Sequence, residues 1–146
     1  MLKATNLLGA IVTLAIYFLC TLTFVCRLLG RPRLGRWFGY PLMLMALPLG
    51  YLALKAPQLG RPVLYCVQIV LMLLFLLVEL LLDYALKADF RQVRWMVISY
   101  VVLFFAATGG MLGVAAYGGS TWTAAAVGLF FVMAILALVQ RAVTGT

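Results

Sequence analysis

The sequence predicts an all-α membrane protein, a single bundle of five transmembrane helices with short loops. Its mean hydropathy of +1.19 is the first indication. Only 10% of the 146 residues are charged, whereas a soluble domain of this size needs far more charge on its surface. The basic residues also gather in short clusters between long uncharged runs, which is the usual pattern of membrane topology signals. We therefore interpret residues 1–146 as one transmembrane domain.

Uncharged runs and the breaks between them define the spans, which we expect at about 4–29, 37–54, 62–86, 94–117 and 120–141. At ~1.5 Å per residue, the uncharged run Ala4–Cys26 is long enough to cross a ~30 Å hydrocarbon core. The second span contains Pro41 and Pro48. Each proline removes a backbone donor and crowds the preceding turn, so we expect this span to bend.

One uncharged run, Trp95–Gln140, is about twice as long as a single crossing and must contain a turn. Gly118 and Gly119 supply residues suited to a tight turn, so two antiparallel helices are expected. Small residues let helix backbones approach closely. Their four-residue spacing on both helices predicts a tightly packed hairpin, through Gly109 and Gly113 on one side and Ala124 and Gly128 on the other.

The distribution of charge predicts the orientation. With five crossings, one face receives eight of the 11 basic residues, namely Arg27, Arg31, Arg33, Arg36, Lys87, Arg91, Arg94 and Arg141. The other face keeps Lys3, Lys55 and Arg61. If the second span does not cross, the split becomes 6 against 5. Because cytoplasmic loops carry the excess of Lys and Arg, we predict five crossings with the N-terminus outside and the C-terminus cytoplasmic. The expected location is the cell membrane, as a multi-pass protein of a bacterial cytoplasmic membrane.

Composition also sets the expectations for cofactors and partners. The chain has no His, and its three Cys form no CxxC pair, so ordinary zinc and haem sites lose their usual ligands. We expect no cofactor and no metal, and we interpret Cys20, Cys26 and Cys66 as small buried hydrophobes. The short basic clusters do not form a phosphate-tracking patch, so no nucleic acid is expected. The expected partners are the lipid bilayer and either further copies of the chain or a membrane complex.

A polar stripe follows the third predicted span. At ~100° per residue, four polar side chains fall within about 60° of one another: Tyr65, Gln68, Glu79 and Asp83. Lys87 continues the stripe and can pair with Asp83 at the cytoplasmic interface. Glu79 lies deeper, where its charge is costly unless it is paired, solvated or protonated.

The first predicted span carries a matching stripe. A seven-residue repeat marks one side of a helix packed at a shallow crossing angle, and the repeat here is Asn6, Thr13, Cys20 and Arg27, with Tyr17 close to the same line. We expect the two stripes to face each other, with Arg27 shared between Asp83 and Glu79. Either Ser99 or Tyr100 of the fourth span, at about the same depth, can donate a hydrogen bond to Glu79.

These stripes support three classes of function. The first, which we favour, is binding or transport of a small ligand or a proton through a polar seam around Glu79. The second is a non-catalytic subunit or assembly factor whose charges hold helices together. The third is an intramembrane lipid-modifying enzyme that uses Glu79 or Asp83 as acid or base, although the sequence contains none of the usual hydrolase, zinc-protease or nucleotide-binding motifs. No catalytic residue is assigned. The predicted ligand- or proton-binding residues are Glu79, Asp83, Arg27, Gln68, Tyr17, Ser99 and Tyr100.

Overall fold

The structure is a computed structural model that describes residues 2–58, 60, 62–81 and 94–144. These ranges contain helices and no strand, so the predicted all-α class is confirmed. The helices are α1 (Leu2–Leu28), α2 (Pro32–Leu44), α3 (Ala46–Lys55), α4 (Val63–Glu79), α5 (Arg94–Ala116) and α6 (Ser120–Thr144).

The second predicted span is divided into α2 and α3 by a break at Met45. Pro48 explains the position of the break, because its missing N–H and its ring both act on the carbonyl four residues earlier, at Leu44. Backbone bonding continues around the break: the Met45 N–H donates to the Pro41 carbonyl at 3.2 Å, and the Leu49 N–H donates to the Met45 carbonyl at 3.2 Å. The break thus coincides with Pro48, whereas Pro41 lies inside α2, and the bend of this span stays a prediction.

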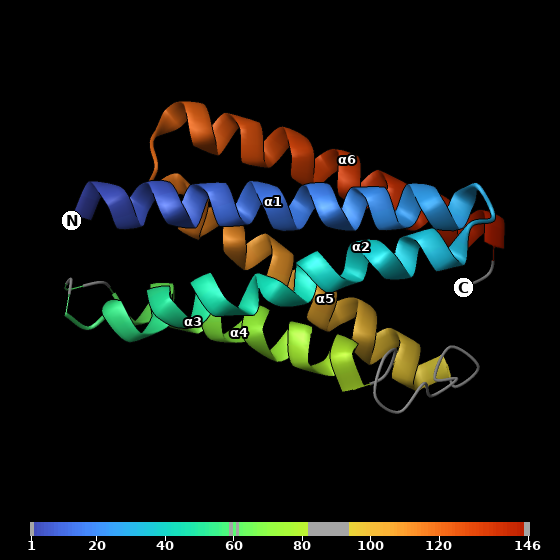
Figure 1. The fold of residues 1–146 in the computed structure, drawn as a ribbon, viewed down its shortest axis with the longest axis horizontal. Helices are drawn as coiled ribbons and strands as arrows, with labels where there is room; N and C mark the ends of the chain where they lie inside the picture. The colour runs from blue at the N-terminus through green and yellow to red at the C-terminus, as the bar shows by residue number, and fades with distance from the viewer. Residues whose placement is uncertain (1, 59, 61, 82–93, 145–146) are drawn as a thin grey trace.

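Helices α1 and α5 each pack against several of the other helices. Figure 1 shows α1 along the long axis with α6 beside it, while α5 crosses obliquely behind α1 and α2. Helix α1 packs mainly on α6, α2 and α5, and α4 packs mainly on α5 and α3. The core between them contains one fully or almost fully buried side chain from each of five helices: Ile16, Leu52, Ile69, Met111 and Met133.

The predicted packing of the last two spans through their small residues is wrong. A side chain added at Gly109 or at Gly128 would meet open space, and Ala124 is exposed. Gly113 faces Gln68 of α4 instead. Helix α6 packs mainly on α1, so the small residues of α5 bring it close to α4 rather than to α6.

Four helical segments are long and apolar enough to cross a membrane: Lys3–Leu28, Arg94–Ala116, Ser120–Val143 and Trp37–Lys55, the last made of α3 and most of α2. Helix α4 is a shorter apolar helix over Val63–Glu79, and the predicted end of that span, at 82–86, lies outside the described residues. Large apolar side chains also cover the outer surface, with Leu54 78% and Val63 79% exposed. An apolar surface of this extent is consistent with a hydrocarbon surrounding.

Candidate functional site

Arg27 lies in the last turn of α1, and the backbone that follows fixes the end of that helix. Gly30 has a φ of 73°, which glycine adopts without the steric cost of a Cβ. The Gly30 N–H donates to the Arg27 carbonyl at 3.2 Å, and the Arg31 N–H donates to the Cys26 carbonyl at 2.8 Å. This is the Schellman pattern of bonds. It holds the Arg27 guanidinium at one end of the bundle, where a cation also interacts favourably with the helix dipole.

Glu79, at the end of α4, is joined to α5 by Tyr100. The Tyr100 hydroxyl donates a hydrogen bond to the Glu79 Oε2, and the Tyr100 ring packs against Phe75 with 5.7 Å between ring centroids. Ser99 is exposed, and its hydroxyl donates to the Trp95 carbonyl of its own helix at 2.9 Å. Of the two donors predicted for Glu79, the structure therefore places Tyr100 there and Ser99 elsewhere.

Helix α1 contributes Cys20 and Arg27 to the same end of the bundle. The Cys20 side chain is buried, two turns before Arg27 on the same helix. We call Arg27, Glu79 and Tyr100 the Glu79 cluster, because Tyr100 bonds Glu79 and lines the same cavity as Arg27. Asp83 lies outside the described residues, so the sharing of Arg27 between Asp83 and Glu79 stays a prediction.

Tyr17 lies deeper in the bundle than this cluster and is fully buried. Its hydroxyl donates to the Thr108 carbonyl of α5. One turn earlier, the Thr13 hydroxyl donates to the Gly9 carbonyl of its own helix at 2.8 Å and lies 3.4 Å from the Met111 carbonyl of α5. Thr13 and Tyr17 of the α1 stripe thus face α5. On the α4 stripe, the Tyr65 hydroxyl would lie 3.8 Å from a Cβ added at Gly9 of α1, and the wider contact between the two stripes stays a prediction.

Gln68 lies against the glycine-containing face of α5. A Cβ added at Gly113 would lie 2.4 Å from the Gln68 Nε2, and one added at Gly110 would lie 3.4 Å from its Cγ. The two glycines leave the space that this amide fills between α4 and α5. Gln68 and Glu79 are ~16 Å apart along the helix axis at ~1.5 Å per residue, so Gln68 does not belong to the Glu79 cluster.

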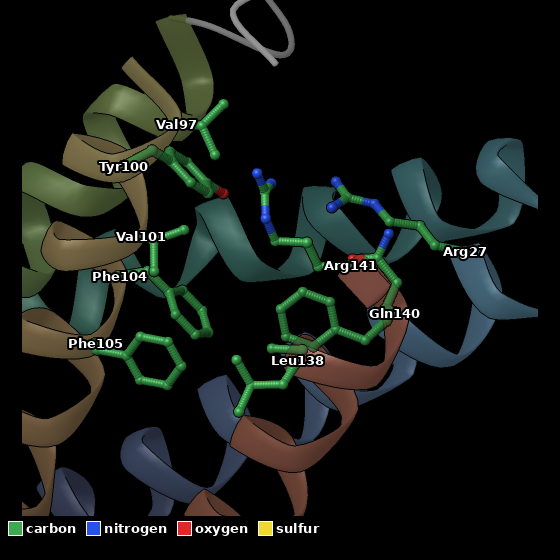
Figure 2. A pocket seen from close by; sticks show the side chains of 11 residues that line it. Arg27, Val97, Tyr100, Val101, Phe104, Phe105, Leu138, Gln140 and Arg141 are labelled. Carbon is green, nitrogen blue, oxygen red and sulfur yellow. The ribbon is translucent and has the colours of Figure 1, made fainter. Parts of the chain in front are cut away.

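A cavity of about 80 Å³ opens beside the cluster, between α1, α5 and α6. We name it the arginine cavity, because Arg27 and Arg141 are the charged side chains among the described residues that line it. Figure 2 shows both guanidinium groups and the Tyr100 hydroxyl directed toward the same space. The polar wall also includes Gln140, and the apolar floor is made mainly of Phe24, Val101, Phe104, Phe105 and Leu138.

Gln140 and Arg141 are candidates that the sequence patterns did not identify as site residues. The charge pattern indicates Arg141 only as a topology signal, although this residue follows a long apolar run directly after Gln140. In the structure Gln140 is 3% exposed. A buried amide next to an arginine at the end of a span is a signal for a polar site, but it does not indicate which helix the pair faces.

The arrangement combines hydrogen-bond donors with a carboxylate at one end of the bundle. Guanidinium and hydroxyl groups can bind an anion, and a carboxylate can hold a proton. Within 2–58, 60, 62–81 and 94–144, no group of three His, Cys, Asp or Glu is placed to hold a metal ion. Comparisons with known proteins find no matching family model, no matching curated protein and no matching solved structure. The proposed function is therefore based on the geometry of the arginine cavity.

Proposed function

We propose that this protein is a multi-pass membrane protein that binds a small ligand in the arginine cavity. Tyr100 carries the proposal, because it lines the cavity and also donates a hydrogen bond to Glu79. A ligand that contacts Tyr100 is thereby coupled to the carboxylate. Arg27 from α1 and Arg141 from α6 complete a polar wall to which three helices contribute. A few convergent polar groups above an apolar floor are the usual composition of a small-molecule site.

Binding is better supported than passage through the bundle. Thr13, Tyr17 and Thr108, deeper along the polar seam, have no exposed surface. Their hydroxyls all donate to backbone carbonyls. A ligand moving along the seam would have to break the bond between Tyr17 of α1 and Thr108 of α5, at about 1–3 kcal/mol for a buried group left unsatisfied. Passage therefore requires a second conformation, whereas binding at the end of the seam does not.

The proposed orientation puts the arginine cavity at the cytoplasmic face of a cell membrane. Arg27 and Arg141 belong to the eight basic residues that five crossings gather on one side, and cytoplasmic loops carry such an excess. The N-terminus then lies outside and the C-terminus in the cytoplasm. A bacterial cytoplasmic membrane is the location that we propose.

Two neighbouring valines of α5 provide a matched test of binding. Val101 lines the arginine cavity, whereas Val102 is 63% exposed on the outer surface. Val101→Trp should fill the cavity, and Val102→Trp should place the same ring outside it. We expect native mass spectrometry of the purified protein to detect bound small molecules on the wild type and on Val102→Trp, and far less on Val101→Trp. Equal retention by Val101→Trp, with unchanged helix content, would overturn the proposal.

A further inference from the structure

We infer that the ligand of the arginine cavity is an anionic amphiphile, with a phosphate group between Arg27 and Arg141 and an acyl chain against the aromatic floor. This inference rests on the proposed function and specifies the chemical class of its ligand. Charge, depth in the membrane and the shape of the cavity each support it independently.

The charges around the cavity favour an anion. Arg27 and Arg141 come from different helices, and Figure 2 shows both guanidinium groups directed toward the space beside the Tyr100 hydroxyl. Glu79 offsets one positive charge from behind Tyr100, so these described residues retain one excess positive charge. A phosphate placed between two guanidinium groups reduces their mutual repulsion and can accept bidentate hydrogen bonds from each.

The depth of the two arginines matches the level of lipid headgroups. Arg27 lies in the last turn of α1 and Arg141 in the last turn of α6. In a membrane-spanning helix, a basic residue at the end of a long apolar run lies at the interface between hydrocarbon and water. Basic pockets between helices on the cytoplasmic side are suited to anionic headgroups. The cavity therefore meets the bilayer where lipid phosphates are found.

The floor of the cavity suits a hydrocarbon chain. The Phe104 ring packs edge-on against the rings of Phe24 and Phe105, with centroid distances of 5.7 and 5.1 Å. Leu138 lines the cavity and is also 61% exposed, so a chain that starts at the arginines can continue over Leu138 into the bilayer. A volume of about 80 Å³ holds several water-sized groups but not a whole lipid. It fits a phosphate with its first methylene groups, and the rest of the chain stays in the membrane.

Binding of defined lipids tests the ligand class. The full chain, in a neutral detergent, is titrated with short-chain phosphatidylglycerol, with phosphatidylcholine of the same chain length and with inorganic phosphate. Arg141→Gln removes one side of the site, and Arg31→Gln removes an exposed arginine at the same end of the bundle as a control. We expect phosphatidylglycerol to bind roughly tenfold more tightly than either other ligand. Arg141→Gln should weaken it by roughly tenfold or more, because charge-assisted hydrogen bonds are lost, and Arg31→Gln should leave it unchanged.

The other outcomes separate this inference from the proposed function. Equal affinity for the two lipids, or unchanged binding by Arg141→Gln, would overturn the anionic headgroup. Inorganic phosphate that binds as tightly as phosphatidylglycerol would assign the site to free phosphate and overturn the acyl chain. If Val101→Trp releases the molecules bound to the wild type while Arg141→Gln keeps them, the cavity binds a ligand of another class. Binding of phosphatidylglycerol by Val101→Trp at the wild-type affinity would place the lipid elsewhere and count against the cavity itself.

Discussion

The Tyr100 hydroxyl donates a hydrogen bond to the Glu79 Oε2, and this contact connects α5 to α4 beside the arginine cavity. A carboxylate at this position in an apolar helix is costly unless it is paired or hydrogen-bonded. Tyr100 supplies such a donor, and it also lines the same cavity as Arg27. The hydrogen bond from Tyr100 helps to explain how so apolar a chain accommodates Glu79.

Tyr100→Phe should lower the free energy of unfolding by about 1–3 kcal/mol, because Glu79 loses a hydrogen-bond donor. The phenyl ring retains the contact with Phe75. Ser99→Ala is the control, since this hydroxyl is exposed and bonds within its own helix. The control should change stability by less than about 0.5 kcal/mol. Denaturant unfolding of both variants in the same detergent measures the difference, and equal stabilities would show that the Tyr100 bond contributes little.

Glu79→Gln should fold normally, because the amide keeps an oxygen that accepts the Tyr100 hydrogen bond. We expect its free energy of unfolding to stay within about 1 kcal/mol of the wild type. If Glu79 is instead the structural partner of Arg27, the neutral side chain leaves a buried cation unpaired, at a cost of about 3–5 kcal/mol. A loss of that size in thermal or denaturant unfolding would remove Glu79 from the ligand- or proton-binding residues.

Gly113→Ala should be less stable than Gly109→Ala by at least about 1 kcal/mol. Replacing glycine by alanine inside a helix normally stabilises it by about 0.5–1 kcal/mol, and the Gly109 position is open. At Gly113 the added methyl group would lie 2.4 Å from the Gln68 amide nitrogen, so the Gln68 amide must shift in the interface between α4 and α5. Unfolding of the two variants under identical conditions gives the comparison. Equal gains at both positions would contradict the close approach of Gln68 to α5.

Cysteine labelling tests the proposed orientation. The background variant has Cys20, Cys26 and Cys66 replaced by alanine, and single cysteines are introduced at the exposed positions Arg33 and Ser120. With five crossings and the excess of basic residues inside, a membrane-impermeant maleimide should reach position 33 only from the cytoplasmic side and position 120 only from outside. Reaction of both positions from the same side would contradict this topology.

Local chemistry in the sequence determined the fold class, the approximate helix positions and the break at Met45. Long apolar runs specify helices, because the backbone must satisfy its own hydrogen bonds where water is absent. Pro48 interrupts its helix through atoms only one turn away. The sequence also indicated that Tyr100 lies near the depth of Glu79, because the depth of each residue follows from counting along its own span.

Only the tertiary structure decided which helix faces meet. It packed α5 against both α1 and α4, set Gly113 against Gln68 and brought Arg141 to the same cavity as Arg27. Lipid tails are as apolar as leucine, so an apolar helix such as α5 shows no contrast between a buried face and a lipid-facing one. The neighbours of such a helix are selected by the close packing of side chains from the whole bundle at once, which a pattern along one span does not contain.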